Sequence, residues 1–506
     1  MKRSFLVPLF LFFWSFTLAQ TAPPTPATPQ VAPAPSVQPP AVVPPSARGV
    51  PTPSTQLELD DAPPPHKLSP DEAKDLLASV DEVLRFASRD TLLPIKHGVK
   101  KAIVSREQVE KYLSEKMEND VDRIRFERSE LVLKKFGLLP RDFDLHTFLI
   151  KLLAEQVAGY YDEKSKTMNL LDWNEPEMQK PVMAHELTHA LQDQSYNLEK
   201  MSKHEEEIEK RGLEDLDALI QNDEESTCRT AVLEGQAMIV LLDYVLAPAN
   251  RSVAETPALV DFFIKQSAME KSKDSPVFDS APLLLQDELI FPYRQGMSFI
   301  KELLLAGGKK MAYTGVLDRL PQTTREIMEP KEYLAGRRVA PLLLPDLGFL
   351  KKDYEGYDAG AIGQLDVEIL LKVYADDSVA ARLNHEWRGG AYYAAGRKGA
   401  KPPDKNSSAH VGLFYISKWS NPAAAQEFAK LYATALPQRY KGLKHLAADA
   451  AQPGLDRYQS DDGLIFIRHT GTAVVAVESF DPDSAAKLIQ MGLKQALGGV
   501  EPVKAP

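Results

Sequence analysis

The stretch Pro181–Gln194 reads PVMAHELTHALQDQ and determines how the sequence around it is interpreted. It contains the pattern H-E-x-x-H, in which His185 and His189 are four residues apart. Residues four apart on a helix lie on the same side, so both imidazoles can reach one metal ion. Glu186 is rotated by about 100° from His185, which places its carboxylate beside the ion, where it can accept a proton from a metal-bound water. The pattern therefore predicts a helix that carries a metal site and a catalytic base.

Two histidines leave a zinc site incomplete, because catalytic zinc uses three protein ligands and a water. A third histidine six residues after His189, with glycine at position 192, is excluded, since Ser195 and Gln192 occupy those positions. Glu234 is a lone carboxylate within the apolar run AVLEGQAM. Burying such a carboxylate without a partner is costly, so it needs a cation. We expect Glu234 to be the third ligand.

The alternative third ligands are acids at the polar start of a predicted helix over Asn222–Tyr244, namely Asp223, Glu224 and Glu225. Acids in such positions cap the helix and interact favourably with its dipole, and this is how we interpret them. Cys228 is interpreted as a small buried residue and not as a ligand. Gly235 and Ala237 are small, and we expect them to let another helix approach closely.

Helical patterns and a hairpin surround this motif. The strands of the predicted hairpin are Gly159–Tyr161 and Thr167–Leu171. A loop is predicted over Asn174–Lys180, and the acidic run His204–Asp217 predicts an exposed helix face. The other predicted helices start at Ser69 and Ser105 or cover Val121–Phe136 and Leu145–Val157.

The chain becomes loop-like near Pro341–Tyr357, where we place a domain boundary. The part after it predicts an α+β accessory domain over residues 358–500, whose role the sequence does not reveal. Predicted strands are Ala391–Ala395, His410–Ser417, Leu464–His469 and Ala473–Glu478, and predicted helices are Asn421–Leu436 and Pro482–Leu497. The expected fold class is α+β: a mainly helical domain with a small β-hairpin or sheet over residues 67–345, followed by this separate α+β domain.

The first residues are typical of targeting and not of a folded domain. Residues 1–19 have a positive start, an apolar run and a small-x-small ending, which predicts a signal peptide cleaved after Ala19. An uncleaved anchor is the alternative, although the apolar run is shorter than the ~20 residues of a spanning helix. Residues 20–66 are rich in Pro, Ala and Thr, which predicts a disordered linker. We therefore expect a secreted or periplasmic protein without an integral membrane domain after signal removal.

Composition narrows the classes of function. Of 506 residues, 44% are apolar and 26% charged, which excludes a wholly disordered, collagen-like or multi-span membrane protein. The net charge is −11 and no long basic stripe occurs, so we do not expect nucleic acid as a partner. Cys228 is the only cysteine, so no disulfide can form within the chain.

With these residues the sequence resembles the zincin metallopeptidases, and among them the gluzincins, whose third ligand is a glutamate. Its layout AGYYD, AHELTHALQDQ and LEG-A is similar to that of a family of secreted bacterial metallopeptidases. The resemblance covers roughly residues 100–340 and implies Zn²⁺ as cofactor and a peptide or protein substrate. It also implies that Glu186 activates the metal-bound water and then passes the proton to the leaving amine. The sequence departs from the thermolysin-type N-E-x-x-S-D pattern, because Leu233 precedes the glutamate and Met238 replaces the aspartate.

Two alternatives stay open at this point. One is a non-enzymatic secreted binding protein that retains a metal site, and the other is a metallohydrolase of a non-peptide bond. A strand of the hairpin can pair with an extended substrate, but the sequence does not show which strand forms the edge. Candidate oxyanion donors are Tyr293, Arg294 and Tyr333, although packing of the aromatic rings is the preferred interpretation.

Overall fold

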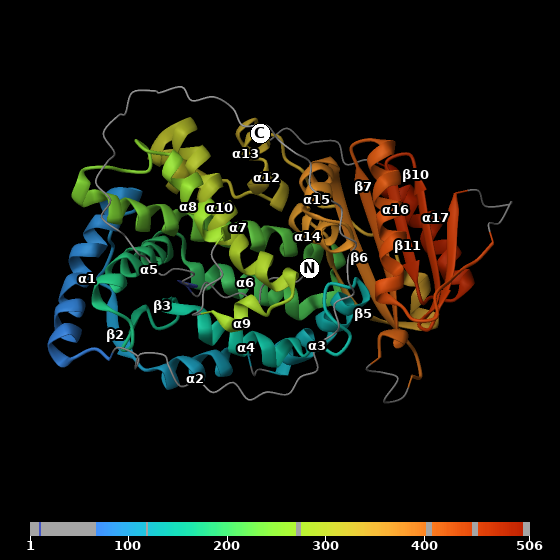
Figure 1. Ribbon diagram of the computed structural model, residues 1–506, viewed down its shortest axis with the longest axis horizontal. Helices are drawn as coiled ribbons and strands as arrows, with labels where there is room; N and C mark the ends of the chain where they lie inside the picture. Colours follow the sequence, from blue (N-terminus) through green and yellow to red (C-terminus); the bar gives the residue numbers. More distant parts are fainter. Residues whose placement is uncertain are drawn as a thin grey trace, which may run out of the picture. The chain divides into compact units, whose positions relative to one another are not determined.

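Helices dominate the chain up to about residue 350 and a seven-stranded antiparallel sheet dominates the rest, so the fold is α+β (Figure 1). The computed structural model describes residues 67–117, 120–269, 275–400, 407–447 and 454–498, with backbone only at 116–117, 120–126 and 267–269, and the backbone of Phe10 and Leu11. Apart from these two residues, the predicted signal peptide and linker lie outside the described residues. From Lys67 onward, the described chain belongs to one compact unit.

A small four-stranded sheet precedes the motif helix. Its strands are β1 (Phe10–Leu11), β2 (Lys100–Val104), β3 (Val157–Asp162) and β4 (Thr167–Leu171), in the order β1-β3-β4-β2. The antiparallel pair β3–β4 confirms the predicted hairpin. β2 lies parallel to β4 and was not predicted, because its pairing partner is more than sixty residues away in the sequence. β1 pairs antiparallel with the other edge of β3.

The first helices confirm the predicted starts. Ser69 and Glu72 form a capping box at the start of α1, with the Glu72 N–H donating to Ser69 Oγ and the Ser69 N–H to Glu72 Oε2. These helices are α1 (Pro70–Thr91), α2 (Arg106–Met117), α3 (Asp120–Lys135) and α4 (Leu145–Gln156).

The motif helix α5 covers Pro176–Tyr196, so the predicted loop over Asn174–Lys180 is wrong for most of its length. Pro181 lies inside the helix near its start, where the missing N–H costs only one intrahelical bond. Gln179 stabilises the additional turn, because its Nε2 donates to Leu171 O and Asn174 O at 3.0 and 2.9 Å. Pro181 locally favours a helix that starts no earlier than residue 181, but the contacts of Gln179 stabilise a helix that starts at Pro176.

Helix α7, which carries Glu234, covers Leu216–Leu246 and is longer than predicted. The segment Leu216–Ala249 is long and apolar enough to cross a membrane, but 72% of its most apolar window is buried inside the protein. It therefore behaves as a core helix. It packs against α5 and against α10 (Leu283–Lys309).

Small residues bring α7 and α10 into backbone contact. A Cβ atom added at Gly235 would lie 2.3 Å from the carbonyl carbon of Gly296, and one at Gly296 would lie 2.0 Å from Ala231 O. The prediction that Gly235 permits a close helix approach is therefore confirmed. At its far end α10 breaks at Gly308, where φ is 65°, and the π-helix η3 (Lys310–Gly315) follows.

The remaining helices of this part are α6 (Leu198–Arg211), α8 (Ala258–Met269), α9 (Pro276–Asp279), α11 (Val316–Asp318), α12 (Thr324–Met328) and α13 (Pro330–Leu334). Short 3₁₀ turns are η1 (Gly212–Glu214), η2 (Ala247–Ala249), η4 (Gly348–Lys352), η5 (Asn384–Glu386) and η7 (Ser408–His410).

The large sheet has the strand order β5-β6-β7-β11-β10-β9-β8. All four predicted strands are present, as β6 (Trp387–Arg397), β7 (Val411–Trp419), β10 (Gly463–Thr470) and β11 (Ala473–Glu478). Three strands were missed: β5 (Tyr354–Ala361), β8 (Lys444–His445) and β9 (Leu455–Ser460). β5 reads YEGYDAGA, and its glycines and acids hide the strand signal.

Side chains alternate along each strand, so every strand contributes residues to both faces of the sheet. Both faces are covered by other elements. One face shares a hydrophobic core with the helical part of the chain and with α14 (Gln364–Tyr374), α15 (Asp377–Leu383) and α16 (Pro422–Arg439). The sheet residues in this core include Tyr392, Tyr415 and Val474. Tyr393, Phe414 and Val475 face α17 (Pro482–Leu497) and the apolar segment around Leu342–Leu350.

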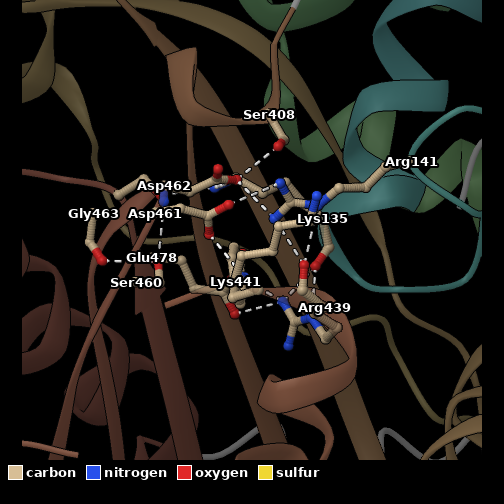
Figure 2. Close-up of polar contacts among 12 residues, drawn as sticks. Lys135, Arg141, Ser408, Arg439, Lys441, Ser460, Asp461, Asp462, Gly463 and Glu478 are labelled. Carbon is tan, nitrogen blue, oxygen red and sulfur yellow. Dashed lines mark hydrogen bonds and ion pairs between the residues drawn. The ribbon is translucent and has the colours of Figure 1, made fainter. Parts of the chain in front are cut away.

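A buried charge network joins the end of α3 to this sheet (Figure 2). Lys135 Nζ lies 2.7 Å from Ser479 Oγ and 3.5 Å from Asp462 Oδ2. Arg439 donates to both carboxylate oxygens of Glu478, and its guanidinium also donates to the Lys135 carbonyl. The side chains of Lys135, Arg439 and Glu478 are at most 2% exposed.

Helix α7 also contacts the sheet part directly. The Ala361 N–H donates to Asp223 Oδ2 at 3.0 Å, and the Thr324 N–H donates to Glu224 Oε2 at 2.7 Å. The contact between Asp223 and Ala361 crosses the boundary predicted near Pro341–Tyr357, whereas Thr324 lies before it, and that boundary stays a prediction.

Candidate metal centre

Three side chains converge between α5 and α7. Nε2 of His185 lies 3.1 Å from Nε2 of His189 and 3.0 Å from Oε2 of Glu234, and Nε2 of His189 lies 3.5 Å from the same oxygen. The two histidines are one turn apart on α5, and the glutamate comes from α7, which packs against it. Within the described part of the chain, these three residues form the group that could hold a metal ion.

The separations fit a tetrahedral ion. Zinc bonds of about 2.0–2.1 Å imply edges of about 3.3 Å between neighbouring ligand atoms, and the three measured edges of 3.0, 3.1 and 3.5 Å scatter around that value. Oε1 of Glu234 is buried and has no hydrogen-bond partner among the described residues. A cation at the centre of the three ligand atoms would supply the charge partner that this buried carboxylate needs.

The electrostatics of the group favour a positive charge at its centre. Burial lowers the pKa of His185 to about 4. Burial also opposes the charged form of His189, but the Glu234 carboxylate outweighs it and raises the pKa of His189 to about 9. For Glu234 burial opposes the charged form, while His189 and His185 hold its pKa down at about 2. A charge on His189, whose Nε2 is 3.1 Å away, adds to the effect of burial in lowering the pKa of His185.

Glu186 lies beside these three side chains and is held by the hairpin. The Tyr161 N–H of β3 donates to Glu186 Oε2 at 2.8 Å, whereas Oε1 is buried without a hydrogen-bond partner among the described residues. Burial raises the pKa of Glu186 to about 8, and a cation held by the three neighbouring side chains would lower this pKa toward the range that a general base needs. One oxygen is therefore fixed and the other is available for proton transfer.

A second contact fixes the same hairpin on α5. The Tyr161 hydroxyl donates to Asp193 Oδ2 at 2.8 Å, and Lys166 Nζ lies 2.8 Å from the same oxygen. Sequence reasoning did not identify Tyr161, Lys166 or Asp193. The pairing of an acid in the motif helix with a lysine in the hairpin turn was the available signal, but nothing in the sequence shows that the two elements touch.

The alternative ligands lie elsewhere on α7. Asp223 and Glu224 accept hydrogen bonds from Ala361 and Thr324, and the charges near Glu225 are those of Arg338 and His204. Cys228 is buried, as expected.

Of the candidate oxyanion donors, Tyr293 contacts the site. Its ring is stacked with that of His185, with centroids 6.4 Å apart. The Tyr333 hydroxyl donates to Arg319 O at 2.8 Å, and its ring packs on Phe299, which agrees with the packing interpretation. Asp287 is the charged group that acts on Arg294.

Comparisons with known proteins add no relative. No protein-family profile matches the chain, and neither a curated protein nor a solved structure matches it. The resemblance to zincins therefore rests on the motif and on the residues around it.

Proposed function

We propose that this chain is a zinc-dependent peptidase that acts outside the cytoplasm. The observation that carries the proposal is the convergence of His185, His189 and Glu234 on one point, with Glu186 beside them. Structural zinc sites are closed by four protein ligands, whereas catalytic sites use three and leave a position open. The described residues supply three, which favours a catalytic site.

The residues divide into ligands and a base. His185 Nε2, His189 Nε2 and Glu234 Oε2 would hold the ion. Bound zinc supplies Lewis acidity, which polarises a scissile carbonyl and lowers the pKa of a water toward neutrality. Glu186 takes the proton of the attacking water at Oε1 and delivers it to the amine nitrogen as the C–N bond breaks. The Tyr161 N–H keeps the other oxygen of Glu186 in place.

The outer edge of β3 supports a peptide as substrate. β2 occupies the outer edge of β4, and Phe10–Leu11 pairs antiparallel with β3 through Gly159 and Val157. An extended segment can therefore add to β3 as close as two residues from the N–H that binds Glu186. Removal of residues 1–19 as a signal peptide would leave this edge open to an extended substrate.

Burial favours a second candidate function. His185, Glu186 and Glu234 are each 0% exposed, so the site is closed to a polypeptide in this conformation. The metal would then brace two core helices of a non-enzymatic binding protein. The open coordination position and the partner-free Oε1 of Glu186 favour the peptidase over this alternative.

The Glu186→Gln variant separates the two candidates. We expect it to retain zinc, to keep its thermal stability and to lose chelator-sensitive cleavage of a mixed peptide library. A variant that cleaves as fast as wild type would overturn the proposed mechanism. A wild-type protein that binds zinc but cleaves no peptide would favour the bracing function. Hydrolysis of esters without peptide cleavage would indicate a metallohydrolase of a non-peptide bond.

A further inference from the structure

A chain of side-chain amides leads away from His189 on the side opposite to the metal position. Nδ1 of His189 lies 2.8 Å from Gln192 Oε1. Gln192 Nε2 donates to Gln236 Oε1 at 2.8 Å, and Gln236 Nε2 donates to the carbonyls of Ala312 and Tyr313 at 2.6 and 3.0 Å. Both glutamines are 0% exposed.

The donor and the acceptor of every hydrogen bond between these amides follow from the two carbonyls at the far end. Carbonyl oxygens only accept hydrogen bonds, so the amide nitrogen of Gln236 must face Ala312 and Tyr313. Its oxygen then faces Gln192 and can only accept. Gln192 must therefore present its nitrogen to Gln236 and its oxygen to His189. An oxygen at Nδ1 requires a proton on Nδ1, which leaves the lone pair of a neutral ring on Nε2.

A second carbonyl fixes Gln192 independently. Gln192 Nε2 also donates to Leu233 O at 3.1 Å, so both of its hydrogens are used and its orientation does not depend on Gln236 alone. Leu233 directly precedes Glu234. The same amide thus connects the ring of His189 to the backbone next to Glu234.

The anchor of the chain is the π-helix η3. Ala312 and Tyr313 are buried within it, and η3 begins after the break at Gly308. Single turns of π-helix are rare and frequently occur at functional sites. This turn directs two carbonyls at Gln236, 76 and 77 residues away in sequence.

We propose that Gln192 and Gln236 are positioning residues that hold the proton of His189 on Nδ1 and direct Nε2 toward the metal. This inference rests on the metal-binding part of the proposed function and not on peptide cleavage. Ligating histidines usually donate this proton to a carboxylate, a carbonyl or a water. A glutamine oxygen performs the same task without adding charge, and the second glutamine keeps the first from rotating.

The direct test is the protonation pattern of His189 in the zinc-loaded wild-type protein. Long-range ¹H–¹⁵N correlation of histidine-labelled protein should show His189 with a protonated Nδ1 and a metal-bound Nε2. Metal on Nδ1 with the proton on Nε2 would overturn the proposed role of the two glutamines while leaving zinc binding intact. A protein that binds no zinc would overturn both the proposed role of the two glutamines and the proposed function.

Variants provide a second readout through zinc affinity, measured by competition with a chromophoric chelator. Gln192→Leu and Gln236→Leu should each weaken zinc binding by about 10- to 100-fold. Gln179→Leu is the matched control, because Gln179 is also buried on α5 and bonds to backbone, but at β4 and Asn174. It should lower thermal stability without changing zinc affinity. Equal affinities in all three variants would contradict the proposal.

Discussion

Nε2 of His185 lies 3.0 Å from Oε2 of Glu234, 49 positions later in the chain. The two residues come from different core helices, and both are completely buried. Such an arrangement places a neutral imidazole and a carboxylate where their ligand atoms can share one cation.

Glu234→Ala should abolish stoichiometric zinc binding, because it removes one of the three proposed ligands and leaves the two imidazoles without a counter-charge. The loss should exceed the ~10- to 100-fold typical of losing a partner that only orients a ligand. Glu225→Ala is the control, since Glu225 on the same helix is near Arg338 and His204 instead. Metal analysis of both purified variants checks the assignment, and zinc loss in the Glu225 variant alone would reassign the ligand.

Removal of metal should destabilise the wild-type protein. A ligand that binds only the folded state stabilises it by about 4 kcal/mol when its free concentration is ~1,000 times Kd. We expect a chelator to lower the Tm of the wild type and to leave that of Glu234→Ala unchanged. The same Tm shift in both proteins would place the metal elsewhere.

Gly235→Ala should separate α7 from α10. The new Cβ would lie 2.3 Å from the Gly296 carbonyl carbon, and neither backbone can yield locally. Overpacking of this kind costs about 1–3 kcal/mol, and more where backbones meet. Zinc affinity should fall as well, because Glu234 is the neighbouring residue. Gly98→Ala is the control, since a Cβ there meets no atom within 4 Å. Chemical denaturation measures the difference.

Glu478→Gln should destabilise the junction between α3 and the large sheet (Figure 2). The substitution leaves Arg439 and Lys135 buried with less negative charge, and breaking a buried pair costs about 3–5 kcal/mol. Glu427→Gln removes the partner of Arg382 in an exposed pair and should cost less than about 1 kcal/mol. Similar unfolding free energies for both variants would refute the structural role of the network.

Asp243 should make stability depend on pH. Burial and the adjacent Asp90 raise the pKa of Asp243 to about 7, although Lys309 and the Val253 N–H oppose the shift. Burial and these same two aspartates raise the pKa of the nearby Tyr313 far above this window. Because the folded state keeps the Asp243 proton to higher pH than the unfolded state, this contribution is complete below pH ~4. It is lost as pH rises toward about 7, by at most about 1.4 kcal/mol per pH unit. Asp243→Asn should flatten that part of the profile, and an unchanged profile would contradict the assignment.

Much of the site could be predicted because its signals are local. The H-E-x-x-H spacing specifies two ligands on one helix face, and the burial cost of a lone carboxylate singles out Glu234. The start of α5 could not be predicted, because Pro181 argues against a helix and the contacts of Gln179 with β4 are long-range. The same holds for Gln192 and Gln236: a buried glutamine has no distinctive pattern, and its partner carbonyls lie in a distant π-helix.

Helix α7 binds strand β5 through Asp223 and carries Glu234 about 16 Å further along its axis, at 1.5 Å per residue. It therefore connects the large sheet to the candidate metal centre. A ligand or partner that shifted the sheet would move Glu234 relative to the two imidazoles. For protein engineering, cutting the chain near residue 345 to obtain a minimal metal-binding fragment would remove β5, and with it this hydrogen-bond partner of Asp223.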